Sequence, residues 1–208
     1  MLEAVRFLFF STIETISAFV LMLSIFRLKA SYFIWPALFV SLMMNLQSFY
    51  LREATSLSFL AFTINTLLFI LLLATVVRIP IIWASIISIT GTFLYTVIQG
   101  IIILLLFGTM TPDMQTSSTG SLIQAITSAW VLTICWLLHK FKIGFTADFE
   151  NLRFKWEHGL VITLIIAVLA ICAYLFYIND FPLTIIFLAI TSTVFLYYAV
   201  KKERDYYS

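Results

Sequence analysis

The chain has 208 residues, of which 62% are hydrophobic and only 11% charged, and its formal net charge is +2. A soluble domain averages about half apolar and about a quarter charged residues, so this composition excludes an ordinary soluble protein. The small net charge gives no reason to expect a nucleic-acid partner. Long continuous apolar runs, rather than short alternating segments, predict an all-α, polytopic integral membrane bundle embedded in a lipid bilayer.

The apolar runs, taken in chain order, number seven. They cover residues 5–26, 31–50, 56–77, 81–107, 121–139, 159–178 and 181–200. Each is close to the length of about 20 residues that a helix needs to cross a bilayer. The sequence therefore predicts seven transmembrane helices in a single domain, residues 1–208. The connection at 78–80 is short enough that the third and fourth helices should be antiparallel neighbours. The first run has no cleavage site of the signal-peptide type, so we expect a retained helix.

The basic residues predict the orientation of these helices. With the N-terminus outside, ten of the twelve Lys and Arg residues fall in cytoplasmic segments, and only Arg6 and Arg52 fall outside. The ten are Arg27, Lys29, Arg78, Lys140, Lys142, Arg153, Lys155, Lys201, Lys202 and Arg204. Cytoplasmic segments of membrane proteins carry an excess of such residues. The pattern therefore predicts a multi-pass protein of the plasma membrane with a cytoplasmic C-terminus.

The connection between the fifth and sixth runs has an amphipathic pattern. Phe145, Phe149, Leu152 and Trp156 follow one another at spacings of four, three and four, with charged residues between them. This spacing is typical of a helix that lies in the membrane interface. We expect a cytoplasmic interfacial helix near residues 145–158, which serves either as a structural element or as a docking surface for a partner.

Strongly polar side chains interrupt the apolar runs at five positions. Glu14 lies near the middle of the first run, and its helical face includes Ser11 and Ser17, so it should face other helices rather than lipid. The other four are amides: Asn45, Asn65, Gln99 and Gln124. At about 1.5 Å per residue, all five lie roughly 5 to 13 Å from the predicted outer edge of the bilayer.

Two interpretations of these five residues stay open. In the first, they line an outward-facing polar cavity with Glu14 at its floor. A protonated Glu14 would donate a hydrogen bond to a ligand amide, and an ionised Glu14 would attract a cationic group. In the second, the polar side chains bond one another and set the register of neighbouring helices. A carboxylate inside a membrane helix carries an unfavourable free energy that setting helix register alone does not require. This favours a ligand-binding function for Glu14.

The fourth and fifth runs carry two further features. Small residues recur every four positions along the fourth run, at Ala84, Ser88, Thr92, Thr96 and Gly100. Such a ridge allows close helix packing, either as a seam inside the bundle or as a dimer interface. In the fifth run, Cys135 and His139 share one helical face, the minimum for a nucleophilic enzyme, although both residues are common at such positions for structural reasons. We expect no enzymatic activity, no cofactor and no metal.

The stretch "FLFFSTIETISAFVLMLSIFRLK" at 7–29, the seven runs and the basic tail "KKERDYY" resemble the N-terminal sensor region of agr-type GHKL histidine kinases. Those proteins are peptide-pheromone receptors of Gram-positive bacteria that act in quorum sensing. The resemblance implies recognition of an extracellular peptide or small lipophilic signal. Only eight residues follow Val200, so no kinase domain is expected and the signal would pass to a protein partner or through a homo-oligomer. The sequence thus predicts a non-catalytic membrane sensor or accessory module. The alternative is a small-solute transporter or the substrate-binding membrane subunit of one.

Overall fold

The computed structural model describes residues 2–54, 58–108, 118–142, 144, 163, 166–171, 174, 177–178 and 181–207. All regular secondary structure within these ranges is helical, which confirms the all-α prediction. The elements are α1 Leu2–Ile25, the 3-10 turn η1 Ala30–Phe33, α2 Ile34–Ala54, α3 Ser58–Leu72, the π-helical turn η2 Leu73–Val77, α4 Ile81–Phe107, α5 Ser118–Lys140 and α7 Phe181–Tyr207.

These bounds agree closely with the predicted apolar runs. The fourth run and α4 cover the same residues, 81–107, and the third run ends with η2 at Val77. The last helix is longer than predicted and continues to Tyr207. The sixth run, 159–178, and the predicted interfacial helix with Phe145, Phe149, Leu152 and Trp156 lie largely or entirely outside the described residues.

Among the described residues, four helices are long and apolar enough to cross a membrane, at Val5–Ile25, Ala30–Phe49, Ile81–Leu106 and Thr119–Lys140. Two shorter apolar helices cover Ala61–Thr75 and Pro182–Val194. The first of these continues from α3 into η2, where the hydrogen bonding changes from α-helical to π-helical at Leu73. The protein is therefore helical with several candidate membrane spans, and the number seven stays a prediction.

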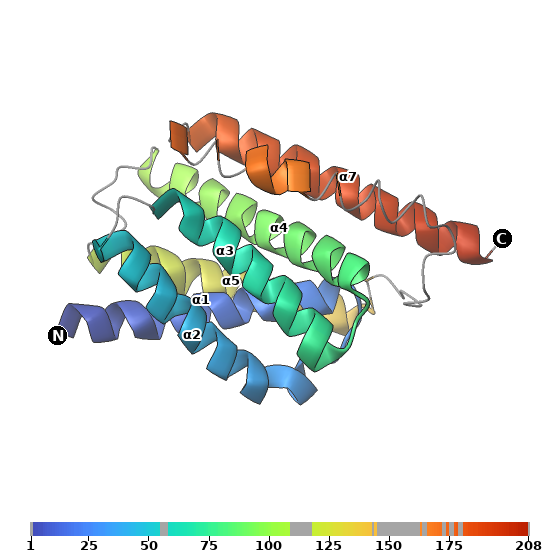
Figure 1. Ribbon diagram of the computed structural model, residues 1–208, viewed down its shortest axis with the longest axis horizontal. Helices are drawn as coiled ribbons and strands as arrows, with labels where there is room; N and C mark the ends of the chain where they lie inside the picture. The colour runs from blue at the N-terminus through green and yellow to red at the C-terminus, as the bar shows by residue number, and fades with distance from the viewer. Residues whose placement is uncertain are drawn as a thin grey trace.

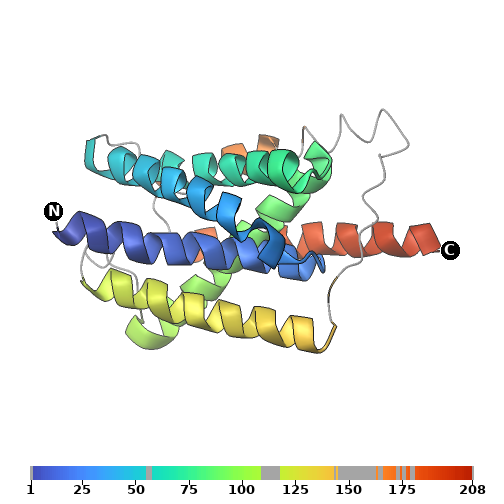
Figure 2. The ribbon, with the colours of Figure 1, turned by 90° about the horizontal axis from the view of Figure 1, so that it is seen from below.

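The helices alternate in direction along the chain. α1, α3, α5 and α7 run one way, and α2 and α4 run the other way (Figure 1). α1 packs against α2, α4 and α5, while α4 also packs against α3 and α7 (Figure 2). The contact between α3 and α4 confirms the antiparallel pair that the short connection at 78–80 predicts. α1 and α4 are thus the two helices through which the others are joined.

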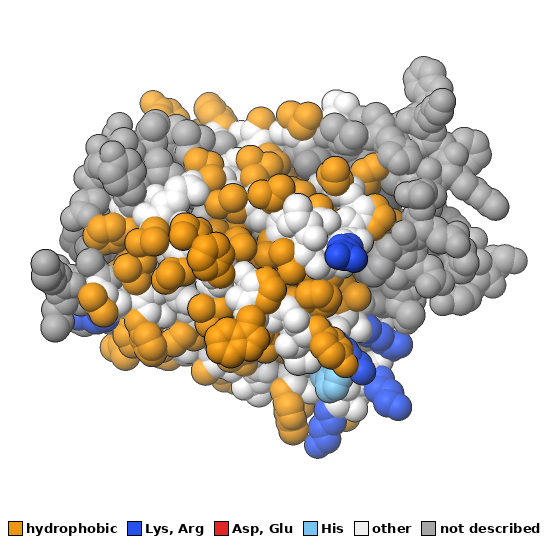
Figure 3. All heavy atoms as spheres, turned by 60° about the horizontal axis from the view of Figure 1, so that its bottom comes forward, with side chains coloured by type: hydrophobic (Ala, Val, Ile, Leu, Met, Phe, Trp, Pro, Cys, Tyr) orange, Lys and Arg blue, Asp and Glu red, His pale blue; other side chains and the backbone are white. Residues whose placement is uncertain are grey.

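The apolar core lies where α1 and α4 meet. Phe19 and Met22 of α1 and Ile86, Ile87 and Phe93 of α4 are all fully buried. Hydrophobic side chains also cover much of the outer surface, as Figure 3 shows for one face. A soluble protein rarely exposes so much contiguous apolar surface, whereas a surface in contact with lipid requires it.

Basic side chains gather at one end of the bundle, which we call the basic end. It consists of Arg27, Lys29, Arg78, Lys140 and Lys142, and the cluster is visible at one edge of Figure 3. Arg27, Arg78 and Lys142 each have a left-handed backbone, with φ of 51°, 61° and 53°. Residues of this conformation end helices, and a cation there interacts favourably with the helix dipole.

The small-residue ridge of α4 lies inside the protein. Ala84, Ser88, Thr92 and Gly100 are buried, and Thr96 is half-buried. A dimer interface would require these positions to be exposed in the monomer, so their burial favours an internal seam. The helices also approach closely at a residue outside this ridge. A Cβ atom added to Gly91 would lie 2.2 Å from Cγ and 3.2 Å from Cα of Met22.

Gly91→Ala is therefore expected to push α1 and α4 apart and to lower the free energy of unfolding by about 1 to 3 kcal/mol. The neighbouring Met22 backbone prevents relief by a side-chain rotation alone. Thermal unfolding of the purified protein in detergent micelles would measure the loss. Thr133→Ala, on an exposed face of α5, is the control. Equal stability of the two variants would contradict this packing.

Candidate functional site

Glu14 and Gln99 meet at the contact between α1 and α4. Nε2 of Gln99 donates a hydrogen bond to Oε1 of Glu14 over 2.8 Å. The two side chains come together because the helices are antiparallel, which brings the first half of α1 beside the second half of α4. Both residues are half-buried, so the pair lies at the edge of the helix contact rather than in the fully buried core.

A chain of buried hydroxyl groups continues from Glu14 across three helices. Ser17 Oγ donates to the backbone oxygen of Glu14 over 2.8 Å and lies 3.4 Å from the hydroxyl oxygen of Tyr95. That hydroxyl lies 3.3 Å from Oγ of Ser128 on α5. Tyr95 is only 4% exposed, and both serines are fully buried. We call Glu14, Ser17, Tyr95, Gln99 and Ser128 the Glu14 cluster.

Two members of this cluster were missed by the sequence analysis. Tyr95 lies four residues before Gln99, and therefore on the same face of α4. That spacing was a usable signal, because a tyrosine needs a partner for its hydroxyl wherever it is buried. Ser128 carries no such signal, since serine is common in membrane helices and often bonds its own backbone.

Asn45 belongs to a second set of polar contacts, on a different face of α1. Its Oδ1 accepts hydrogen bonds from Ser11 Oγ over 2.8 Å and from Thr15 Oγ1 over 3.2 Å. Its Nδ2 donates to Thr12 Oγ1 over 3.2 Å. Asn45 is only 2% exposed, so these contacts satisfy an amide that water does not reach. They hold α2 against α1 in a defined register.

Asn65 and Gln124 complete the predicted set. Asn65 Nδ2 donates to Ser48 Oγ over 2.9 Å, which joins α3 to α2. Gln124 is half-buried on α5 and makes no hydrogen bond to any residue that the structure describes. Of the five predicted residues, the structure therefore brings together only Glu14 and Gln99. Asn45 and Asn65 each join a separate pair of helices.

This arrangement divides the predicted polar residues by role. The contacts of Asn45 and Asn65 match the interpretation in which polar side chains set helix register. Glu14 differs from them because its side chain is acidic and its neighbours include a buried tyrosine hydroxyl within electrostatic range. Ligand binding by these residues stays a prediction, and Glu14 with Gln99 is the pair on which it now depends.

The Cys135 and His139 pair offers no accessible reaction centre. Cys135 is 4% exposed and lies opposite Ser24 at the interface of α5 with α1. His139 is exposed at the end of α5. A nucleophile must be reachable by its substrate, and this thiol is covered by a helix. Within the described ranges, no three His, Cys, Asp or Glu side chains are placed to hold a metal ion.

No family model, no curated protein and no solved structure matches this chain. The resemblance to agr-type sensor regions therefore stays a prediction that depends on residues 7–29 and the hydropathy pattern.

Gln99→Leu removes the donor that holds Glu14 and is expected to lower the free energy of unfolding by about 1 kcal/mol. Gln124→Leu is the matched control, because it replaces a half-buried amide without a hydrogen bond. It should change stability by less than about 0.5 kcal/mol. Equilibrium unfolding in mixed micelles would measure both values.

The same unfolding measurement can determine the interaction energy between Glu14 and Gln99. A double-mutant cycle with Glu14→Leu and Gln99→Leu should give a coupling energy of about 0.5 kcal/mol or more. A coupling energy near zero, or an equally large effect of Gln124→Leu, would show that the contact contributes nothing to the fold.

Proposed function

We propose that this chain is a non-catalytic membrane sensor or accessory module whose signal is received at the Glu14 cluster. One observation carries the proposal: a half-buried glutamate, bonded to Gln99, joins α1 to α4 inside an apolar bundle. A ligand with a cationic or hydrogen-bond-donating group would compete with Gln99 for that carboxylate. The ligand class that fits is a small peptide or a lipophilic molecule with one such group.

The choice of residue at position 14 supports this proposal. A carboxylate near the centre of a membrane span costs about 2.5 to 3.5 kcal/mol on insertion scales. Asn45 and Asn65 show that this bundle joins helices with amides, which carry no such penalty. Glu14 therefore provides a charge or an acidic proton, which helix packing does not require. Intramembrane carboxylates commonly act in ligand, ion or proton recognition.

The contacts around Glu14 suggest how a signal would travel. Release of Gln99 would loosen α4 from α1, and the hydroxyls of Tyr95 and Ser128 link both helices to α5. α1 and α5 then run side by side to the basic end, where the Arg27 guanidinium donates to the backbone oxygen of Lys142. A shift of α1 would thus change the position of basic residues at the far end of the bundle.

The distribution of charge supports an orientation for this route. The basic end should face the cytoplasm, because cytoplasmic segments are enriched in Lys and Arg. Glu14 lies near the middle of α1, 13 residues before Arg27 and so away from the basic end. We therefore propose a plasma-membrane protein with seven spans, its N-terminus outside and a partner or second copy bound at the cytoplasmic side. The resemblance to agr-type sensors agrees with an extracellular peptide signal.

Glu14→Gln tests this function, since glutamine keeps an acceptor for Gln99 and loses only the charge. The protein in lipid nanodiscs would be titrated with short apolar peptides that carry one free amino group and with their N-acetylated counterparts. We expect a change in tryptophan fluorescence with the free amines only, and a loss of at least about tenfold in affinity in Glu14→Gln. Ten-fold corresponds to one charged contact of about 1.4 kcal/mol.

Two controls separate sensing from its alternatives. Thr193→Val, on an exposed face of α7, should respond as the unaltered protein does. Sealed vesicles containing the protein should show no Glu14-dependent solute flux, whereas such a flux would favour the transporter. If Glu14→Gln binds every peptide unchanged, the carboxylate has no part in recognition.

A further inference from the structure

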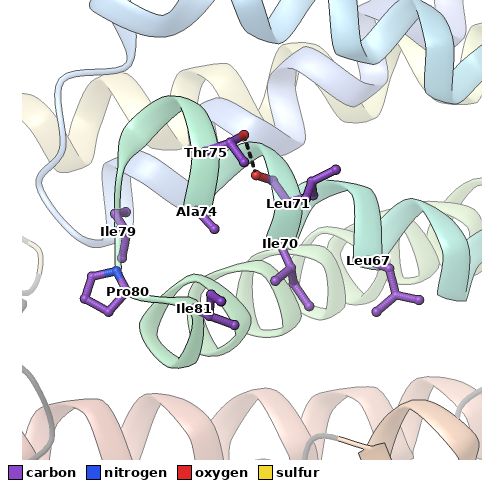
Figure 4. A pocket seen from close by; sticks show the side chains of 8 residues that line it. All are labelled: Leu67, Ile70, Leu71, Ala74, Thr75, Ile79, Pro80 and Ile81. Carbon is purple, nitrogen blue, oxygen red and sulfur yellow. Dashed lines mark hydrogen bonds between the residues drawn. The ribbon is translucent and has the colours of Figure 1, made fainter.

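A second feature lies at the basic end, away from the Glu14 cluster. It is a groove with a volume of about 590 Å³ in the elbow between α3 and α4. One wall is formed by α3 and η2 from Leu67 to Thr75, and the other by Ile79, Pro80 and Ile81 (Figure 4). Except for Thr75, every residue in this lining is apolar.

The local sequence explains why a hollow forms here. The π-helical turn at Leu73–Val77 is wider than an α-helix, and it places Ala74 and Thr75 beside the elbow. Ala74 has a small side chain, which leaves space unfilled. The hydroxyl of Thr75 donates to the backbone oxygen of Leu71 over 2.7 Å, so its hydrogen-bonding capacity is used within the helix. Turns of this kind frequently occur at functional sites.

The groove opens toward the outside of the bundle rather than into its core. Leu71 is 58% exposed and Ile81 is 69% exposed, although both are large apolar residues. The wall from Leu67 to Thr75 spans roughly 12 Å at about 1.5 Å per residue. That length is within the depth of one leaflet, which is half of the roughly 30 Å hydrocarbon core. Its shape and polarity therefore match a lipid acyl chain of a single leaflet.

An exposed cation adjoins the groove in the sequence. Arg78 directly precedes the Ile79 and Pro80 wall, and its side chain is exposed. α4 begins at Ile81 with no acidic residue in its first turn, so the positive end of its dipole also lies beside the groove. The remaining residues of the basic end lie at the same end of the bundle. A cation beside an apolar channel complements an anionic phospholipid, with its phosphate at the cation and a chain in the channel.

We propose that this groove binds one anionic phospholipid, with an acyl chain along η2 and the headgroup at Arg78. The site is independent of any ligand at Glu14. A lipid here packs against both walls of the elbow and so stabilises the packing of α3 against α4. The π-helical turn is where the hydrogen bonding of α3 is irregular, and it is the part of the helix that a bound lipid would stabilise.

Native mass spectrometry tests the site directly. The full chain would be released from micelles that contain equal amounts of phosphatidylglycerol and phosphatidylcholine with identical acyl chains. We expect phosphatidylglycerol to be retained about five-fold over phosphatidylcholine, the value for one basic residue at a membrane surface. Arg78→Asn should remove this preference, since asparagine tolerates the left-handed backbone at this position and carries no charge.

The matched control is Lys140→Asn, which removes a cation of the same end that lies 4.9 Å from the ring of Trp136. It should leave the preference unchanged. Equal losses in Arg78→Asn and Lys140→Asn would overturn the proposal, because they would indicate attraction to the whole basic end.

The apolar part of the site has its own test. Ala74→Phe fills the groove and should lower the retention of both lipids several-fold. Thr75→Leu fills the groove with a smaller side chain, and it should show the same loss of lipid retention if Ala74→Phe does not fold. If the variant that folds retained both lipids as the unaltered protein does, the proposal would be overturned. Soluble glycerol phosphate that competed as strongly as the lipid would also overturn the proposal, because the acyl chain would then contribute nothing to binding.

Discussion

The hydrogen bond from Gln99 to Glu14 depends on a constraint that shapes the whole bundle. A polar group placed in an apolar helix has no water to bond with, so its partner comes from its own backbone or from a neighbouring helix, and a carboxylate or amide depends on the neighbouring helix. α1 meets this constraint on two faces, with Glu14 toward α4 and with its Ser and Thr hydroxyls toward Asn45 of α2. The rotation and the height of α1 are thereby fixed relative to both neighbours, and the apolar core packs around that placement.

Polar, apolar and charged contacts occupy successive levels along α1. The polar links lie between Ser11 and Ser17, around its middle, and the tight contact of Met22 with Gly91 lies in its last turn. At its end, Arg27 bonds the backbone of Lys142, and a Cβ atom on Gly144 would lie 2.9 Å from the backbone oxygen of Ile25. A helix held at three levels moves as a unit. This rigidity is what would connect an event at Glu14 with the basic end, whereas the elbow between α3 and α4 is held by fewer regular hydrogen bonds.

Much of the architecture was predictable because it depends on local properties. The length of each apolar run matches a helix, as 81–107 and α4 show, and the short connection at 78–80 requires an antiparallel pair. The partners of the polar residues were not predictable in the same way. Asn45 and Gln99 are both amides at similar predicted depth, yet one bonds serine and threonine and the other bonds a carboxylate. The ridge of small residues on α4 was visible, but Gly91, which meets Met22 at close range, lies outside that ridge.

The sequence by itself determined the helical class, the approximate helix bounds, the chemistry available in each helix and the gathering of cations near particular helix ends. These follow from hydropathy and charge, which each segment carries independently of the others. Only the tertiary structure decided that Glu14 meets Gln99, that Tyr95 and Ser128 extend this contact to α5, and that a π-helical turn opens a groove beside Arg78. Those outcomes depend on the rotation of each helix about its axis and on the side chains that fill the space between helices. No single segment contains that information, because it arises from packing of all the helices together.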